Sequence, residues 1–337
     1  MPSSLTQRSP GLDRERLVRE LVPPPRFGAE RFSTYRPDPG QPSQAAAVER
    51  LQAYAAAVDE RDTGGWLRLR RRPKGDAAGR GIYLDGGFGV GKTHLLASLW
   101  HEAAGPKSFG TFVEYTNLVG ALGFAPTVEA LKGHELVCID EFELDDPGDT
   151  VLMASLLARL AEAGVAFAAT SNTLPDALGE GRFAAEDFLR EIQALSARFE
   201  VVTVDGPDYR HREHVESPVP LSEEEVREAV DGLDGALLDH FVDVTRHLST
   251  VHPSRYRAML EGVGAVGWTH VRPVTDQAVA LRLVVLVDRL YDADIPVFAS
   301  GLPLVRLFSE DMLKGGYRKK YFRALSRLTS LARVGTR

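Results

Sequence analysis

A glycine-rich turn between two apolar runs constrains this chain more than any other part of its sequence. Residues 81–85 read GIYLD, residues 86–93 read GGFGVGKT, and HLLASLW follows with apolar residues at helical spacing. Glycines in such a turn leave the backbone N–H groups at a helix N-terminus open to an approaching phosphate. The pattern therefore predicts a strand, a phosphate loop and a helix, in that order.

The spacing within this loop assigns roles to its residues. A lysine and a threonine follow the last glycine, so we expect Lys92 to reach the β- and γ-phosphates of ATP and the Thr93 hydroxyl to coordinate Mg²⁺. The expected nucleotide-binding residues are Gly86, Gly87, Phe88, Gly89, Val90, Gly91, Lys92, Thr93 and His94.

A second motif, LVCIDEF at residues 136–142, distinguishes a hydrolase from a kinase. Its four apolar residues predict a buried strand that ends at Asp140, where a carboxylate can hold Mg²⁺ directly or through water. The neighbouring Glu141 can orient and deprotonate an attacking water, a role that a hydrolase requires. We therefore expect Asp140 as a metal ligand and Glu141 as the catalytic base.

A third apolar run, VAFAAT at residues 165–170, ends in Ser171 and Asn172. If this strand lies beside the previous one, the Asn172 amide comes within reach of the γ-phosphate or of the attacking water. The sequence contains no Asn-Lys-x-Asp motif for guanine, which disfavours a GTPase.

The order of apolar runs and helical patterns predicts an α/β fold of the P-loop NTPase type, with a doubly wound parallel sheet. The expected strands are GIYLD, TFVEY, LVCID, VAFAAT and VVTVD. The expected segments are a proline-rich N-terminal arm with a helix at residues 1–78, an ATPase core at 79–215 and a mainly helical domain at 216–337 that ends in a basic helix.

Composition narrows the function classes. A net charge of −7 over 337 residues argues against wholesale nucleic-acid binding. The lone Cys138 suits a reducing compartment, and no apolar run approaches the about 18 residues of a membrane span. We expect a cytoplasmic protein with at most peripheral membrane contact.

The C-terminal stretch from Lys314 to Arg327 carries cations without carboxylates. At helical spacing Arg323 and Arg327 share a face, and we expect this pair to reach nucleotide while Phe322 and Leu325 pack inward. Lys319 and Lys320 would then engage an acidic partner. A basic helix on the surface is an equal alternative.

The motifs GGFGVGKT, CIDEF, ATSNTLPDAL, VVTVDGPDYRHR and YFRALSRL together resemble the ZapE family of AAA+ ATPases, which are associated with bacterial cell division. The resemblance implies Lys92 and Thr93 on nucleotide and Mg²⁺, Asp140 and Glu141 as the acidic pair, and Asn172 as a polar sensor. Asp205 and the pair Tyr209–Arg210 match a family segment.

The resemblance also implies a homo-oligomer in which an arginine finger acts in trans. It further implies a partner in the division apparatus, and FtsZ is the first candidate for that partner. Arg182 is the leading candidate for the finger, ahead of Arg190 and Arg198. Two alternatives stay open. One is a helicase-loader-like ATPase that acts with DNA through RLRRRPK. The other is a nucleotide-binding switch with negligible turnover. The presence of Glu141, the expected catalytic base, disfavours this alternative.

Overall fold

The computed structural model of this chain describes residues 3–11, 13–62, 81–87, 89–143, 147–173, 193, 196–206 and 219–333. It has two compact units, one of residues Asp13–Arg212 and one of Met1–Leu12 together with Glu213–Arg337. This division differs from the three segments expected from the sequence. The N-terminal arm forms no unit of its own, because its first residues belong to the unit of the C-terminal part and the rest to the unit that ends at Arg212.

Among its described residues, the first unit contains a five-stranded parallel sheet in the order β2-β3-β4-β1-β5. The strands are β1 (Gly81–Asp85), β2 (Lys107–Thr111), β3 (Leu136–Asp140), β4 (Ala166–Thr170) and β5 (Phe199–Thr203). The helices are α1 (Arg14–Arg19), η2 (Pro25–Phe27), α2 (Pro42–Asp62), α3 (Lys92–Glu102), α4 (Phe112–Leu122), α5 (Phe124–Leu131) and α6 (Pro147–Glu162).

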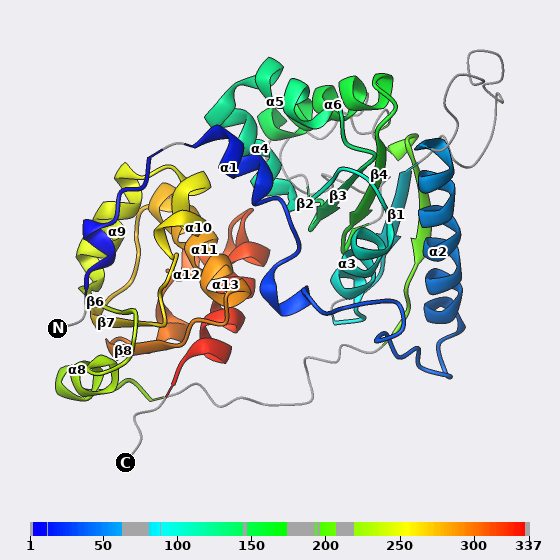
Figure 1. Cartoon of the computed structure of the whole chain (residues 1–337). Coiled ribbons are helices and arrows are strands. Elements are labelled where there is room, and N and C mark those ends of the chain that lie inside the picture. The colour runs from blue at the N-terminus through cyan, green and yellow to red at the C-terminus, as the bar shows by residue number, and fades with distance from the viewer. Residues whose placement is uncertain are drawn as a thin grey trace. The chain divides into compact units, whose positions relative to one another are not determined.

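Both faces of this sheet are covered by helices, as Figure 1 shows. Side chains alternate along each strand, so Ile82 and Leu84 pack with α2 and α3 while Tyr83 packs with α4 and α6. All three side chains are buried. The predicted doubly wound parallel sheet is therefore confirmed.

Most of the predicted strands of this sheet are confirmed. GIYLD and LVCID match β1 and β3, and VAFAAT and VVTVD overlap β4 and β5. The strand predicted at TFVEY is wrong, because β2 ends at Thr111 and α4 begins at Phe112. Thr111 and Glu114 form a reciprocal capping box that starts the helix, which outweighs the β-propensity of the sequence.

The second unit contains a parallel sheet that the sequence analysis did not place, with the described strands in the order β6-β7-β8. The strands are β6 (Ala236–His240), β7 (Ala265–Val271) and β8 (Val297–Gly301). The helices are η1 (Leu5–Gln7), α8 (Glu223–Val230), α9 (Phe241–Thr250), η8 (Pro253–Arg255), α10 (Tyr256–Met259), α11 (Gln277–Asp292), η9 (Leu304–Arg306), α12 (Glu310–Lys314) and α13 (Arg318–Leu331).

The last helix, α13, packs against α11 in this unit (Figure 1). Arg323 donates to Asp288 at 2.9 Å, and Arg327 donates to the other oxygen of the same carboxylate. Burial by itself would raise the pKa of Asp288, but the charges of Arg323 and Arg327 lower it below its usual value.

This ion-pair network corrects two expectations about the basic helix. Arg323 and Arg327 bind a carboxylate of their own unit, so the structure gives them a structural role in place of the expected contact with nucleotide. Leu325 is buried as expected, but Phe322 is 54% exposed and does not pack inward. None of the described helices is long and apolar enough to cross a membrane.

Candidate nucleotide-binding site

Three strand ends of the first unit define the candidate site. In a parallel sheet the carboxyl ends of all strands lie at one edge, where ligands bind in folds of this class. β1 leads into the phosphate loop, β3 ends at Asp140, and β4 leads into Asn172. Because β4 pairs with both β1 and β3, the structure brings the three predicted motifs together.

The phosphate loop depends on glycine at specific positions. Gly91 has φ 89°, and a Cβ there would lie 2.7 Å from Cε2 of Tyr35. A Cβ on Gly86 would lie 2.2 Å from the carbonyl oxygen of Val204. Side chains at these two positions would therefore strain the loop or displace its neighbours.

Lys92 begins α3 and is buried, with 8% of its surface exposed. Its Nζ donates to the carbonyl oxygens of Gly86 at 2.7 Å and Gly87 at 2.5 Å, and to Oδ1 of Asn172 at 2.9 Å. The ammonium group therefore lies over the loop and joins it to the end of β4. The ammonium group and the Asn172 amide are therefore direct hydrogen-bond partners at this edge of the sheet.

Thr93 and Asp140 form the candidate Mg²⁺ site. The Thr93 hydroxyl lies 3.1 Å from both carboxylate oxygens of Asp140, which is 7% exposed. A hydroxyl and a carboxylate fit Mg²⁺, which prefers oxygen ligands and takes the remainder from phosphates and water. No cluster of three or more His, Cys, Asp or Glu residues suited to a metal occurs among the described residues.

A residue that the sequence analysis missed holds the acidic pair in place. Thr170, the last residue of β4, donates its hydroxyl to Oδ1 of Asp140 at 2.5 Å and accepts the backbone N–H of Glu141 at 3.1 Å. Its carbonyl oxygen also accepts the N–H of Phe142 at 2.7 Å. The signal for it was a threonine at the end of a strand that neighbours the acidic strand.

Glu141 has an unusual backbone, with φ 53° in the left-handed region. A non-glycine residue costs about 1–2 kcal/mol in this region, so its neighbours must hold it there. Thr170 bonds its N–H, and the next side chain, Phe142, is fully buried against Tyr83, Phe112 and Phe199. The turn separates Glu141 from the buried strand and leaves its side chain half-buried at the sheet edge.

Asn172 is oriented by groups on both sides of its amide. Oδ1 accepts from Lys92, and Nδ2 donates to Oε1 of Glu143 at 3.4 Å. The predicted sensor residue therefore lies beside the lysine that would bind the γ-phosphate.

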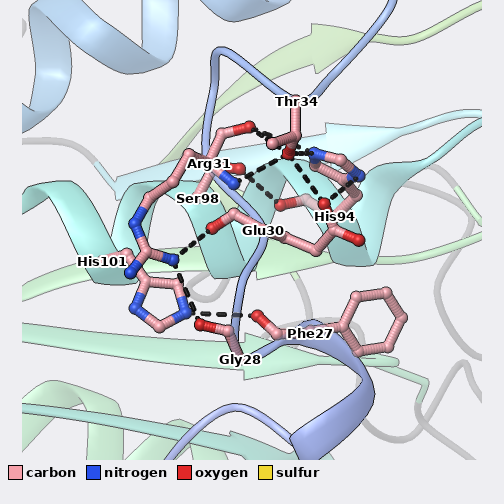
Figure 2. A network of polar contacts seen from close by, with 8 residues as sticks. All are labelled: Phe27, Gly28, Glu30, Arg31, Thr34, His94, Ser98 and His101. Carbon is pink, nitrogen blue, oxygen red and sulfur yellow. Dashed lines mark hydrogen bonds and ion pairs between the residues drawn. The ribbon is translucent and has the colours of Figure 1, made fainter.

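His94 lies elsewhere than the sequence suggested. We expected it among the nucleotide-binding residues, but its ring contacts the N-terminal arm (Figure 2). Nε2 lies 3.0 Å from Oγ1 of Thr34 and 3.1 Å from the carbonyl oxygen of Arg31, and Nδ1 lies 3.3 Å from the Glu30 carboxylate. Its position one residue past Thr93 turns this side chain away from the loop and onto the arm.

Several predicted residues lie outside the described residues: Phe88, Arg182, Arg190, Tyr209, Arg210 and the RLRRRPK run. Asp205 is described, and its backbone bonds to Ser43 and Gln44 near the start of α2. Arg198 is half-buried, and its carbonyl oxygen accepts the N–H of Gly81 at 2.6 Å. It therefore lies at the amino ends of the strands, opposite the candidate site of its own unit.

A comparison with protein families identifies the family of this chain. A model of AFG1-like ATPases matches residues 14–240 and 223–335, which together include both units. The chain belongs to the AFG1-like ATPase family. It is therefore an ATPase, and the parallel sheet with its phosphate loop is the P-loop core expected from the sequence.

Curated relatives of this AFG1-like ATPase agree with that result. It is 27% identical over 295 residues to "Cell division protein ZapE" of Escherichia coli K12, covering 75% of this chain and 78% of the relative. It is 25% identical over 227 residues to "Lactation elevated protein 1 homolog B" of Danio rerio, covering 57% and 45%.

Solved structures of low sequence identity also resemble the AFG1-like ATPase. DnaI matches with a TM-score of 0.43 and 18% identity, over 57% of this chain and 98% of DnaI. A replication initiator DnaA bound to AMPPCP and single-stranded DNA matches with a TM-score of 0.41 and 12% identity, over 91% of each chain. Since both scores lie below 0.5, the fold assignment rests on the sheet order and the family match.

Proposed function

We propose that this AFG1-like ATPase hydrolyses ATP with Mg²⁺ at the edge formed by β1, β3 and β4, and uses the cycle to remodel a protein of the cell-division apparatus. The observation that carries the proposal is the convergence of Lys92, Asn172, Thr93 and Asp140 at one sheet edge. Glu141 is the residue after Asp140, and Thr170 stabilises its left-handed backbone conformation.

Each side chain has a chemical task in this proposal. Lys92 pairs with the β- and γ-phosphates, and Thr93 and Asp140 hold Mg²⁺, which neutralises the charge that develops on the phosphates. Glu141 orients the attacking water and accepts its proton, so it acts mainly in the transition state. Asn172 contacts the γ-phosphate or the water.

The hydrogen bond between Lys92 and Asn172 suggests how the site senses its ligand. A phosphate that binds Lys92 competes with the Asn172 oxygen for the same ammonium group, so binding and release of the γ-phosphate alter the end of β4. Such a local exchange of charged partners can bias a two-state arrangement, which is how a nucleotide cycle produces movement.

The partner and the assembly are inferred from the relatives. The E. coli relative is named for cell division, which makes FtsZ the first partner to test. A homo-oligomer in which Arg182 of one subunit completes the site of the next would supply the arginine that such sites use for the transition state. DNA binding in the manner of a helicase loader remains the competing proposal, and it predicts stimulation by DNA.

The test uses two variants that separate binding from chemistry. Lys92→Ala should lose ATP affinity, whereas Glu141→Gln should bind ATP like the parent and lose turnover, because Glu141 acts on the water. Phosphate release and equilibrium binding of ATP measure the two effects. Parent-rate hydrolysis by both variants would show that the site is wrong.

The Glu141→Gln variant also tests the partner. With ATP bound it should retain purified FtsZ in a pull-down, and Lys92→Ala is the matched control that should not. Stimulation of the parent ATPase by DNA, with no retention of FtsZ, would favour the helicase-loader alternative.

A further inference from the structure

The N-terminal arm contacts the phosphate loop through one aromatic residue. The hydroxyl of Tyr35 donates to the carbonyl oxygen of Val90 at 2.9 Å. The Tyr35 ring lies against Gly91, where a Cβ would come within 2.7 Å, and meets the His94 ring edge-on at 5.3 Å between centroids. Tyr35 therefore contacts Val90 and Gly91 of the loop and His94 in the first turn of α3.

This hydrogen bond controls the direction of a donor in the loop. The peptide bond between Val90 and Gly91 is planar and trans, because the described chain contains no cis peptide bonds. In a trans peptide the N–H points away from the C=O of the same plane. When Tyr35 holds the Val90 oxygen on the side of the arm, the Gly91 N–H points to the opposite side, where the loop would cradle phosphate.

The arm is fixed along α3 at two further points (Figure 2). His94 meets Glu30, Arg31 and Thr34, and Nε2 of His101 lies 3.1 Å from the carbonyl oxygen of Phe27. The two histidines are seven residues apart, so they lie on the same face of the helix two turns apart. This face of α3 holds the segment that leads to Tyr35.

We propose that residues 27–35 of the N-terminal arm form a strap along α3, with Tyr35 as a positioning residue for the phosphate loop. The inference rests on the proposed function, since it requires that residues 86–93 bind the phosphates of ATP.

The test compares nucleotide affinity and turnover in a Tyr35 variant and in a matched control. Tyr35→Phe keeps the ring and removes the hydrogen bond to Val90, so the KM for ATP and the Kd for ADP should rise by about 3- to 10-fold, with kcat nearly unchanged. Tyr54→Phe is the matched control, because it also removes a hydroxyl bond to a backbone carbonyl, that of Phe167, in the same unit. It should leave KM at the parent value.

The outcomes separate the strap from the site itself. If Lys92→Ala loses ATP binding while Tyr35→Phe behaves like Tyr54→Phe, the positioning role of Tyr35 is wrong and the site stands. If Lys92→Ala binds ATP like the parent, the site assignment itself is wrong.

Discussion

Thr170→Val tests whether the hydroxyl at the end of β4 positions the acidic pair. Valine keeps the shape and the β-branching of threonine, so β4 should persist. The change removes the donor to Asp140 and the acceptor for the backbone N–H of Glu141, at a side chain that is 2% exposed.

The magnitude follows from these two bonds. A hydrogen bond to a charged group contributes about 1.5–3 kcal/mol, and a buried N–H deprived of its acceptor costs about 1–3 kcal/mol. We expect the free energy of unfolding of this unit to fall by about 2–4 kcal/mol. Because Glu141 also loses a contact that holds its left-handed backbone, a displacement near 1 Å would lower kcat by about 10²-fold.

The assay compares phosphate release, ADP binding and thermal unfolding in two variants. Thr127→Val is the control, since Thr127 is also fully buried and its hydroxyl donates to the carbonyl oxygen of Gly123, the N-cap of α5, at 2.8 Å. It should lose stability and keep kcat. Thr170→Val should lose kcat and keep ADP affinity, because Lys92 and its loop are unchanged. A Thr170→Val protein that turns over like the control would refute the positioning role.

Other predictions follow from the ion pairs, the thiol and the assembly. Asp288→Asn should lower the free energy of unfolding by about 3 kcal/mol without changing ATP affinity, because it removes the carboxylate shared by two mostly buried guanidiniums. Because its folded pKa is lowered, Asp288 stabilises the fold above about pH 4 and less as the pH falls further, so the parent should lose more stability on acidification than Asp288→Asn. Burial raises the pKa of Cys138, so a thiol reagent at pH 7 should label it only on unfolding; rapid labelling of the native chain would contradict this. If Arg182 acts in trans, mixing Arg182→Ala with Lys92→Ala should restore part of the ATPase activity, and no recovery in confirmed oligomers would remove it from this role.

The phosphate loop and the acidic strand could be predicted because their signals are local. Four glycines before a lysine, and four apolar residues before Asp140, specify their backbone within a few residues. The strand wrongly assigned to TFVEY had a local signal too, but the capping box of Thr111 and Glu114 favoured a helix. Local patterns therefore predict an element well where propensity and capping agree.

Contacts between distant residues were decided by the tertiary structure. Thr170 meets Asp140 across 30 positions, Tyr35 meets Val90 across 55, and Ser4 meets Asp239 across 235. A hydroxyl has the same local sequence pattern whether it faces water or a buried carboxylate, and only chain folding selects its partner.

By itself, the sequence predicted the groups on which the proposed chemistry depends: a phosphate loop, a carboxylate for Mg²⁺ and a glutamate for water. Only the tertiary structure decided which residues hold these groups in place, and that Arg323 and Arg327 pair with Asp288. The physical reason is that catalytic groups are specified by residue type at short spacing, whereas their support comes from hydrogen bonds and packing between strands and helices far apart in the chain.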